Sequence, residues 1–108
     1  MLNTCVIVGK VAAVPEIKRT VNGNVVANMI VEADRSFRNE NGEITKDLFK
    51  IILWRGIAEE CAAVCGPGSL VAVKGRLQSD VHEKDGRSWY NTEIVAEKVS
   101  YLPQNAAV

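Results

Sequence analysis

Apolar and polar residues alternate with a period of two along most of this chain, which is the pattern of β-strands. The alternation predicts five strands, over residues 2–14, 25–33, 47–55, 69–78 and 88–102, with a short continuation of the first strand at 16–20. Asn22-Gly23-Asn24 predicts a hairpin between the first two strands, and the segment 83–87 a turn between the last two, because Asn and Gly tolerate positive φ. The polar stretch 38–46, with a turn at Asn41-Gly42, is predicted to be a surface loop.

One helix is predicted, over residues 56–65. Ile57, Cys61, Val64 and Cys65 recur at helical spacing and should form its buried face. The sequence Gly66-Pro67-Gly68 then ends the helix. The single helix therefore falls between the third and fourth strands.

The order of these elements predicts the fold. Residues 51–53 are apolar on both faces, as in a strand that is buried or curled into a barrel. Gly9 and Gly75 lie inside strands one and four, where glycine permits a sharp bend or bulge. The pattern is that of an all-β OB fold, a five-stranded Greek-key barrel with a helix between strands 3 and 4. An open α+β sandwich is the alternative.

Length and composition indicate a single domain. A chain of 108 residues, 47% hydrophobic and 24% charged, is an ordinary globular sequence with one modest core. We expect one domain over residues 1–102 and a short C-terminal end at 103–108. No apolar run has the length of a membrane span and no secretory signal is present, so the expected location is cytoplasmic and nucleoid-associated, with no membrane partner.

The chain contains three cysteines and one histidine. Cys61 and Cys65 share the apolar helix face, so we expect reduced thiols packed in the core rather than a disulfide framework. Their spacing is not Cys-x-x-Cys and His82 is distant, so no metal site and no cofactor are expected. Nothing pairs a nucleophile with a base, which argues against an enzyme.

Aromatic residues recur beside cations at three places: Arg35 to Arg38, Phe49 to Arg55, and Arg87 to Tyr90. Rings that stack on bases and cations that follow phosphates are what a single-stranded nucleic acid requires. The alternative is that Phe49 and Trp54 are core residues. The predicted nucleic-acid-binding residues are Lys10, Arg19, Arg35, Phe37, Arg38, Phe49, Lys50, Trp54, Arg55, Lys74, Arg76, Arg87 and Trp89.

Charge and surface pattern qualify this prediction. Thirteen Lys and Arg balance thirteen Asp and Glu, whereas domains that bind by phosphate neutralisation alone are usually strongly basic. A local basic face would resolve the conflict, and a mixed solvated surface is the alternative.

Apolar residues on the outside of the predicted sheet point to an interface. The first strand is apolar on both faces, and Val26 and Ile30 lie on the face of the second strand opposite its core side. This pattern predicts a symmetric homo-oligomer.

Several motifs together resemble one family. They include Val8-Gly-Lys10, Arg35-Ser-Phe37, Trp54-Arg55, Gly75-Arg-Leu77 and Tyr90-x-Thr92-Glu93. Over residues 1–102 the chain is similar to bacterial single-stranded-DNA-binding proteins of the replication type. The resemblance implies an OB fold, a homotetramer (a homodimer being possible), and single-stranded DNA bound in replication, recombination or repair. It assigns base stacking to Phe37 and Trp54, beside Lys50 and Arg55.

The sequence also departs from that family. Leu48 and Val81 stand where aromatic residues are usual, and Gln78-Ser-Asp80 where basic residues are usual. The acidic C-terminal tail of the family is absent from the printed sequence, so recruitment of replication or repair partners through such a tail is not expected. Two other functions remain as alternatives: a dimer like primosomal replication protein N acting in replication restart, and a small nuclease.

Overall fold

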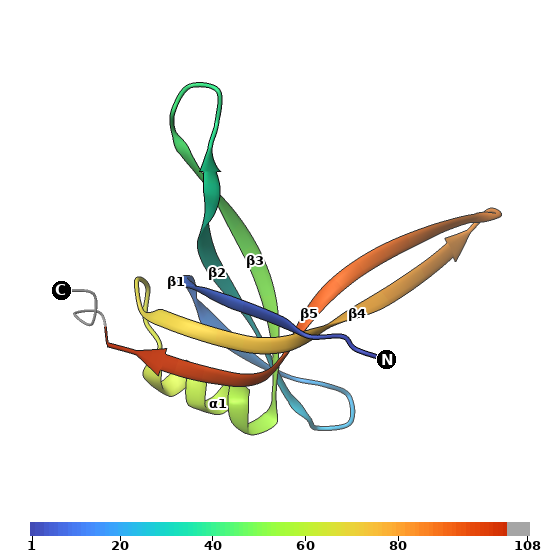
Figure 1. Ribbon diagram of the computed structural model, residues 1–108. Helices are drawn as coiled ribbons and strands as arrows, with labels where there is room; N and C mark the ends of the chain where they lie inside the picture. Colours follow the sequence, from blue (N-terminus) through green and yellow to red (C-terminus); the bar gives the residue numbers. More distant parts are fainter. Residues whose placement is uncertain (104–108) are drawn as a thin grey trace.

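The computed structural model describes residues 1–103, which form a closed barrel (Figure 1). Its strands lie around the barrel in the order β1-β2-β3-β5-β4. Because β1 pairs with both β2 and β4, the sheet has no open end in the barrel, and the alternative of an open sandwich is wrong. The elements are β1 (Cys5–Arg19), β2 (Val25–Arg38), β3 (Ile44–Trp54), α1 (Arg55–Val64), β4 (Leu70–Lys84) and β5 (Arg87–Leu102).

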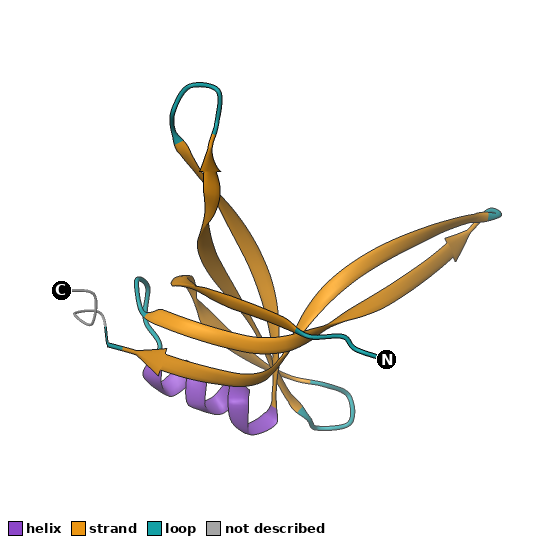
Figure 2. Ribbon diagram, in the orientation of Figure 1, coloured by secondary structure: helices purple, strands orange, loops and turns teal. Residues whose placement is uncertain are grey.

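The predicted OB fold is therefore confirmed, with its helix between β3 and β4. Helix α1 closes one end of the barrel (Figure 2). Of the predicted C-terminal end at 103–108, residues 104–108 lie outside the described residues.

The core lies inside the barrel and is built from alternate residues of the strands. Every second residue of a strand faces the same side, and the largest fully buried side chains are Val11, Met29, Val31, Ile51, Leu53, Cys61, Val71 and Val73. Partly buried Ile57 and fully buried Ala58 of α1 pack on this core. The predicted helix face is wrong at Val64, which is exposed. The buried stripe is centred on Ala58, Cys61 and Cys65, so Val64 lies at its margin.

Two glycines allow the barrel to close. At Lys10, β1 changes partner, pairing with Leu70 of β4 and Glu32 of β2. A Cβ on the preceding Gly9 would lie 2.2 Å from the backbone oxygen of Glu32, and a Cβ on Gly75 would lie 2.3 Å from that of Val95. The ladder of β4 and β5 also shifts register between Lys74 and Gly75. Close backbone approach is thus the physical reason for glycine at both positions.

Two hairpins extend beyond the barrel (Figure 1). We call residues 34–47 the β2–β3 arm and residues 78–93 the β4–β5 arm. The predicted loop at 38–46 is too long, because β2 continues to Arg38 and β3 begins at Ile44. The turn at Asn41-Gly42 is confirmed, with Gly42 at a φ of 77°. Strand β4 likewise continues past Gln78 to Lys84, and Asp85 and Gly86, with φ of 54° and 75°, form the turn. Strand pairing persists here without a buried face.

The first strand also differs from its prediction. It begins at Cys5 rather than at residue 2 and continues through Pro15 to Arg19, with register shifts on both sides of Ala13. Before it, the side chain of Asn3 donates to the Leu77 carbonyl at 2.7 Å and accepts from the Leu77 N–H at 2.9 Å. A side chain thus replaces strand pairing at the N-terminus. The hairpin at Asn22-Gly23 is confirmed, with Gly23 at a φ of 82°.

Candidate functional site

Trp54 and Lys50 lie on the outer face of the sheet formed by β2 and β3. Trp54 stands opposite Val26, and Lys50 stands opposite Ile30. Residues that face each other across two strands share a face of the sheet. Trp54 is 39% exposed, so its ring is available at the surface as well as packed beside its neighbours.

Arg55 follows Trp54 at the turn from strand to helix. Trp54 is the last residue of β3 and the N-cap of α1, with extended φ and ψ of −115° and 142°. Arg55 has a φ of 53°, a left-handed conformation that costs a non-glycine residue about 1 kcal/mol or more. Arg55 is thus the cation that directly follows Trp54 in sequence, where β3 ends at the edge of the outer face.

Phe37 and Phe49 lie on the other side of the same two strands. Both line a cleft of about 480 Å³ between β1 and the β2–β3 arm. Phe49 is half-buried and packs against the core, whereas Phe37 is 83% exposed. Phe37 is therefore the accessible ring of the cleft, and Phe49 supports its floor. Phe37 and Trp54 thus lie on opposite faces and at different heights of the β2–β3 ribbon.

Arg35 lies in this cleft, bound to Asp47. The Nε of Arg35 donates to both carboxylate oxygens at 3.0 and 3.1 Å, and Nη2 donates to Oδ1 at 2.8 Å. The hydrogen bond from Arg35 lowers the pKa of Asp47 below its ordinary value. The pair spans adjacent strands near the base of the arm, where it fixes the guanidinium and offsets its charge.

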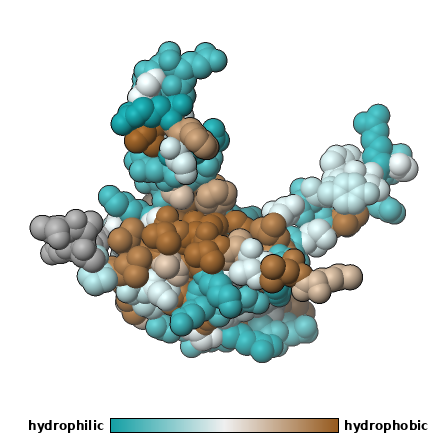
Figure 3. All heavy atoms as spheres, viewed as in Figure 1, coloured by the Kyte–Doolittle hydropathy of each residue, from teal (hydrophilic) through white to brown (hydrophobic). Residues whose placement is uncertain are grey.

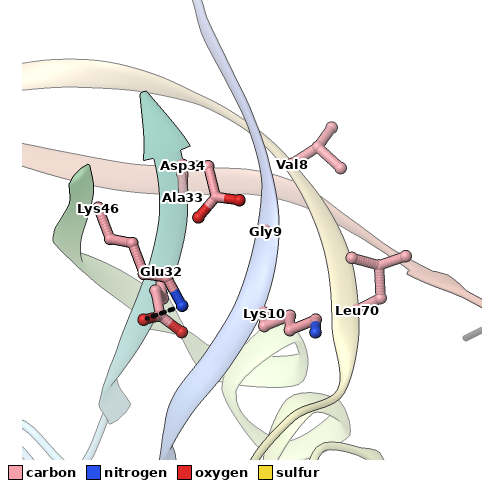
Figure 4. Close-up of a pocket in the computed structure, with 8 residues that line it drawn as sticks. All are labelled: Val8, Gly9, Lys10, Glu32, Ala33, Asp34, Lys46 and Leu70. Carbon is pink, nitrogen blue, oxygen red and sulfur yellow. Dashed lines mark ion pairs between the residues drawn. The ribbon is translucent and has the colours of Figure 1, made fainter. Parts of the chain in front are cut away.

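A second group of charges lies on the outer side of β1 and β2 (Figure 4). Lys46 Nζ is 3.3 Å from Glu32, and Asp34 stands opposite Lys46 in the ladder. The side chain of Lys10 points away from this ion pair in Figure 4. Because two lysines and two acids line the same pocket, it does not concentrate charge of either sign.

The β4–β5 arm carries a third set of aromatic and basic residues. Trp89 stands opposite His82, and Arg87 opposite Lys84 at the tip. Trp89 is 48% exposed and Tyr90, on the other face of the arm, 75%. His82 Nε2 is 3.0 Å from Asp80. Lys84 and Tyr90, which are not among the thirteen predicted binding residues, lie on the same hairpin, Lys84 opposite Arg87 and Tyr90 opposite Val81.

The remaining predicted site residues are dispersed. Arg38 donates to the Gly42 carbonyl at 2.8 Å in the turn of the β2–β3 arm, and Arg19 to the Gly23 carbonyl at 3.5 Å. Arg76 donates to the Gln78 side chain at 2.8 Å. Lys74 stands opposite Val6 on the outer face of β1 and β4. The predicted residues therefore form three aromatic and basic groups with outlying cations, rather than one continuous basic face.

The three cysteines lie in or beside the core. All three thiols are free, Cys61 and Cys65 are buried, and Cys5 is partly buried. Burial raises the pKa of the Cys65 thiol to about 11, which keeps it protonated at neutral pH. Cys61 Sγ lies 3.3 Å from the hydroxyl of Tyr101. Within residues 1–103, no group of His, Cys, Asp and Glu could hold a metal ion, and no helix is long and apolar enough to cross a membrane.

The fold and these surfaces define an OB-fold domain with exposed aromatic and basic groups on two extended hairpins. Residues 2–102 match the Single-strand binding protein family. Because this match covers nearly the whole sequence, the chain belongs to that family.

Individual relatives agree with the family match. The chain is 38% identical over 103 residues to "Single-stranded DNA-binding protein B" of Bacillus subtilis, a match covering 94% of this chain and 91% of the relative. It is 38% identical over 107 residues to the "Single-stranded DNA-binding protein" of Bacillus cereus, covering 97% of this chain but only 63% of that protein. The chain thus spans less than two thirds of the length of some relatives.

A solved structure described as "Plasmodium falciparum SSB complex with ssDNA" has a similar fold. Its TM-score is 0.78 at 22% identity, covering 95% of this chain and 96% of the other. At this identity the likeness shows the fold alone.

Proposed function

We propose that this protein binds single-stranded DNA with little sequence preference and protects single strands in replication, recombination or repair. The observation that carries the proposal is the repeated combination of an exposed ring and a neighbouring cation: Phe37 with Arg38, Trp54 with Arg55, and Trp89 with Arg87. Stacking on aromatic rings contributes about 1 to 3 kcal/mol per base and tolerates any sequence. Family membership and the names of the relatives support the same conclusion.

The alternatives have less support. Family membership favours a single-strand binding protein over a dimer like primosomal replication protein N. A metal-dependent nuclease needs a cluster of carboxylates or histidines to hold its ions, and residues 1–103 contain no such cluster. Membership of the Single-strand binding protein family supports binding without catalysis as the proposed activity.

Electrostatics should contribute modestly to this binding. Two cations of the β2–β3 arm, Arg35 and Lys46, are paired with acids. Each phosphate neutralised on a single strand contributes about −0.7 to the slope of log K against log salt. Arg38, Arg55 and Arg87, the cations that neighbour the three rings, are in none of the ion pairs among residues 1–103. We therefore expect about three phosphate contacts and a slope near −2 for each protomer.

Titration with oligo-dT, followed by tryptophan fluorescence at several salt concentrations, tests both statements. We expect quenching of Trp54 and Trp89 with a shallow salt dependence. An absence of binding at low salt would contradict the proposed function. Binding with a slope twice as steep would instead contradict the modest electrostatic contribution while leaving the function in place.

We also propose that the protein assembles into a homotetramer. Val6 and Val8 on the outer face of β1 are 66% and 54% exposed, and Val8 stands opposite Ala72 of β4. Figure 3 shows a continuous apolar patch over this part of the barrel. A patch of this kind on a soluble protein usually marks an interface, and closed symmetric assemblies are the commonest way to bury one.

Sedimentation of the wild type and of Val8→Lys tests the assembly. We expect a tetramer at micromolar concentration, and a shift toward smaller species for Val8→Lys because a buried lysine would lack a partner. Val21→Lys is the matched control, since Val21 is fully exposed in the turn between β1 and β2. A wild-type monomer at that concentration would rule the tetramer out.

A further inference from the structure

The cleft beside the β2–β3 arm combines a flat ring with a fixed hydrogen-bond donor. Phe37 and Arg35 both line it, together with Asp47 and the half-buried Phe49. Arg35 and Phe37 lie two positions apart in β2, in the segment between Asp34 and Arg38 where the register with β3 shifts, and both line the cleft. Two residues of extended chain span about 7 Å at most. A base stacked on Phe37 would therefore bring one of its edges to Arg35.

Asp47 determines what Arg35 can do in this cleft. A guanidinium has five N–H donors, and Asp47 accepts from Nε and Nη2. The two hydrogens of Nη1 and one of Nη2 remain for a ligand. Because the carboxylate offsets the positive charge, the attraction of a phosphate is weakened, while the remaining donors keep a fixed direction.

The remaining donors suit one kind of base edge. Adjacent donors on Nη1 and Nη2 match two adjacent acceptors, and guanine presents O6 and N7 in this arrangement, whereas adenine presents one acceptor and one donor there. Cytosine also has adjacent acceptors on its pairing edge, but its single ring would cover less of Phe37. We infer that Arg35, positioned by Asp47 beside Phe37, forms a subsite that takes one unpaired base and prefers guanine. This inference rests on the proposed binding of single-stranded DNA.

The experiment compares purines, which are matched for stacking. An oligo-dT just long enough to saturate one protomer is made with one central dG, dA or 7-deaza-dG, and affinities are measured with the full chain. We expect dG to bind about fivefold more tightly than dA, near the lower end of the discrimination of a bidentate arginine contact. Because 7-deaza-dG lacks N7, it should lose most of this gain. Equal affinities for dG and dA would overturn the inference.

Variants then separate a contact to a base from a contact to a phosphate. Arg35→Gln and Asp47→Asn should each abolish the preference for dG over dA. Arg35→Gln should leave the salt slope unchanged, because Arg35 does not neutralise a phosphate here. Asp47→Asn releases the Arg35 charge and should steepen the slope by about 0.7. A shallower slope for Arg35→Gln would show that Arg35 contacts phosphate and would overturn the inference.

Asp34→Asn is the matched control. It removes one negative charge from the same arm, but Asp34 stands opposite Lys46 and makes no ion pair among residues 1–103. Asp34→Asn should keep the dG preference of the wild type. Loss of that preference in Asp34→Asn would count against a specific role of Asp47. Failure to bind any oligo-dT would refute the proposed function, whereas oligo-dT binding without purine discrimination would refute this inference alone.

Discussion

Replacing Gly9 with alanine is expected to lower the free energy of unfolding by about 3 kcal/mol, the upper end of the usual range of about 1 to 3 kcal/mol for overpacking, because the clash is with backbone. The new Cβ would lie 2.2 Å from the Glu32 carbonyl oxygen and 2.9 Å from Cγ1 of Val31. The Glu32 backbone cannot move aside easily, because Glu32 pairs with Lys10 on one side and Leu48 on the other. Urea denaturation followed by tryptophan fluorescence measures the loss.

Gly56→Ala provides the control for this prediction. Gly56 lies in α1, and nothing is within 4 Å of the position of its added Cβ. Alanine there should raise the free energy of unfolding by less than about 1 kcal/mol, because glycine is the less favourable helix residue but Gly56 lies in the first turn of α1. If Gly9→Ala unfolded at the same urea concentration as the wild type, the close approach of β1 and β2 would not limit barrel closure.

The second large effect is expected for the double variant Phe37→Ala/Trp54→Ala, which should lose about 2 to 6 kcal/mol of binding free energy for oligo-dT. Each ring should contribute about 1 to 3 kcal/mol if a base stacks on it. The ladder places Trp54 about 30 Å along the ribbon from Ile44, the partner of Arg38. At such a separation the two losses should add.

Fluorescence anisotropy of a labelled oligo-dT measures this loss without relying on Trp54. Ile44→Ala removes an exposed apolar side chain from the same arm and should leave affinity nearly unchanged. If Trp54→Ala alone folded normally and bound as tightly as the wild type, the ring would serve only to cover the barrel.

The sequence predicted the barrel well but not the arms. Inside the barrel, every second residue of β2 from Val25 to Val31 is buried, and β-branched and other apolar residues are dense enough to mark strands. In the β2–β3 arm both faces meet solvent, and the alternation disappears although the strands remain paired. Residues 38–46 therefore looked like a loop.

The candidate site was predictable only where neighbours in sequence form it. Phe37 with Arg38 and Trp54 with Arg55 could be found in this way. The Arg35–Asp47 pair joins residues 12 positions apart and depends on the register of β2 and β3. The inward direction of Phe49 was predictable, since it shares the alternation of Ile51 and Leu53, and its place in the lining of the cleft leaves its binding role a prediction.

The two arms should unfold locally at a lower free energy than the barrel. Each is a two-stranded ribbon without a second layer, whereas the barrel strands are paired on both sides around an apolar core. Segments with few buried apolar contacts open at much lower free energy than the global unfolding of a domain. Amide hydrogens near the arm tips should consequently exchange with solvent long before those of the barrel. The hairpins can thus change their curvature to follow a flexible polymer while the barrel that anchors them keeps its shape.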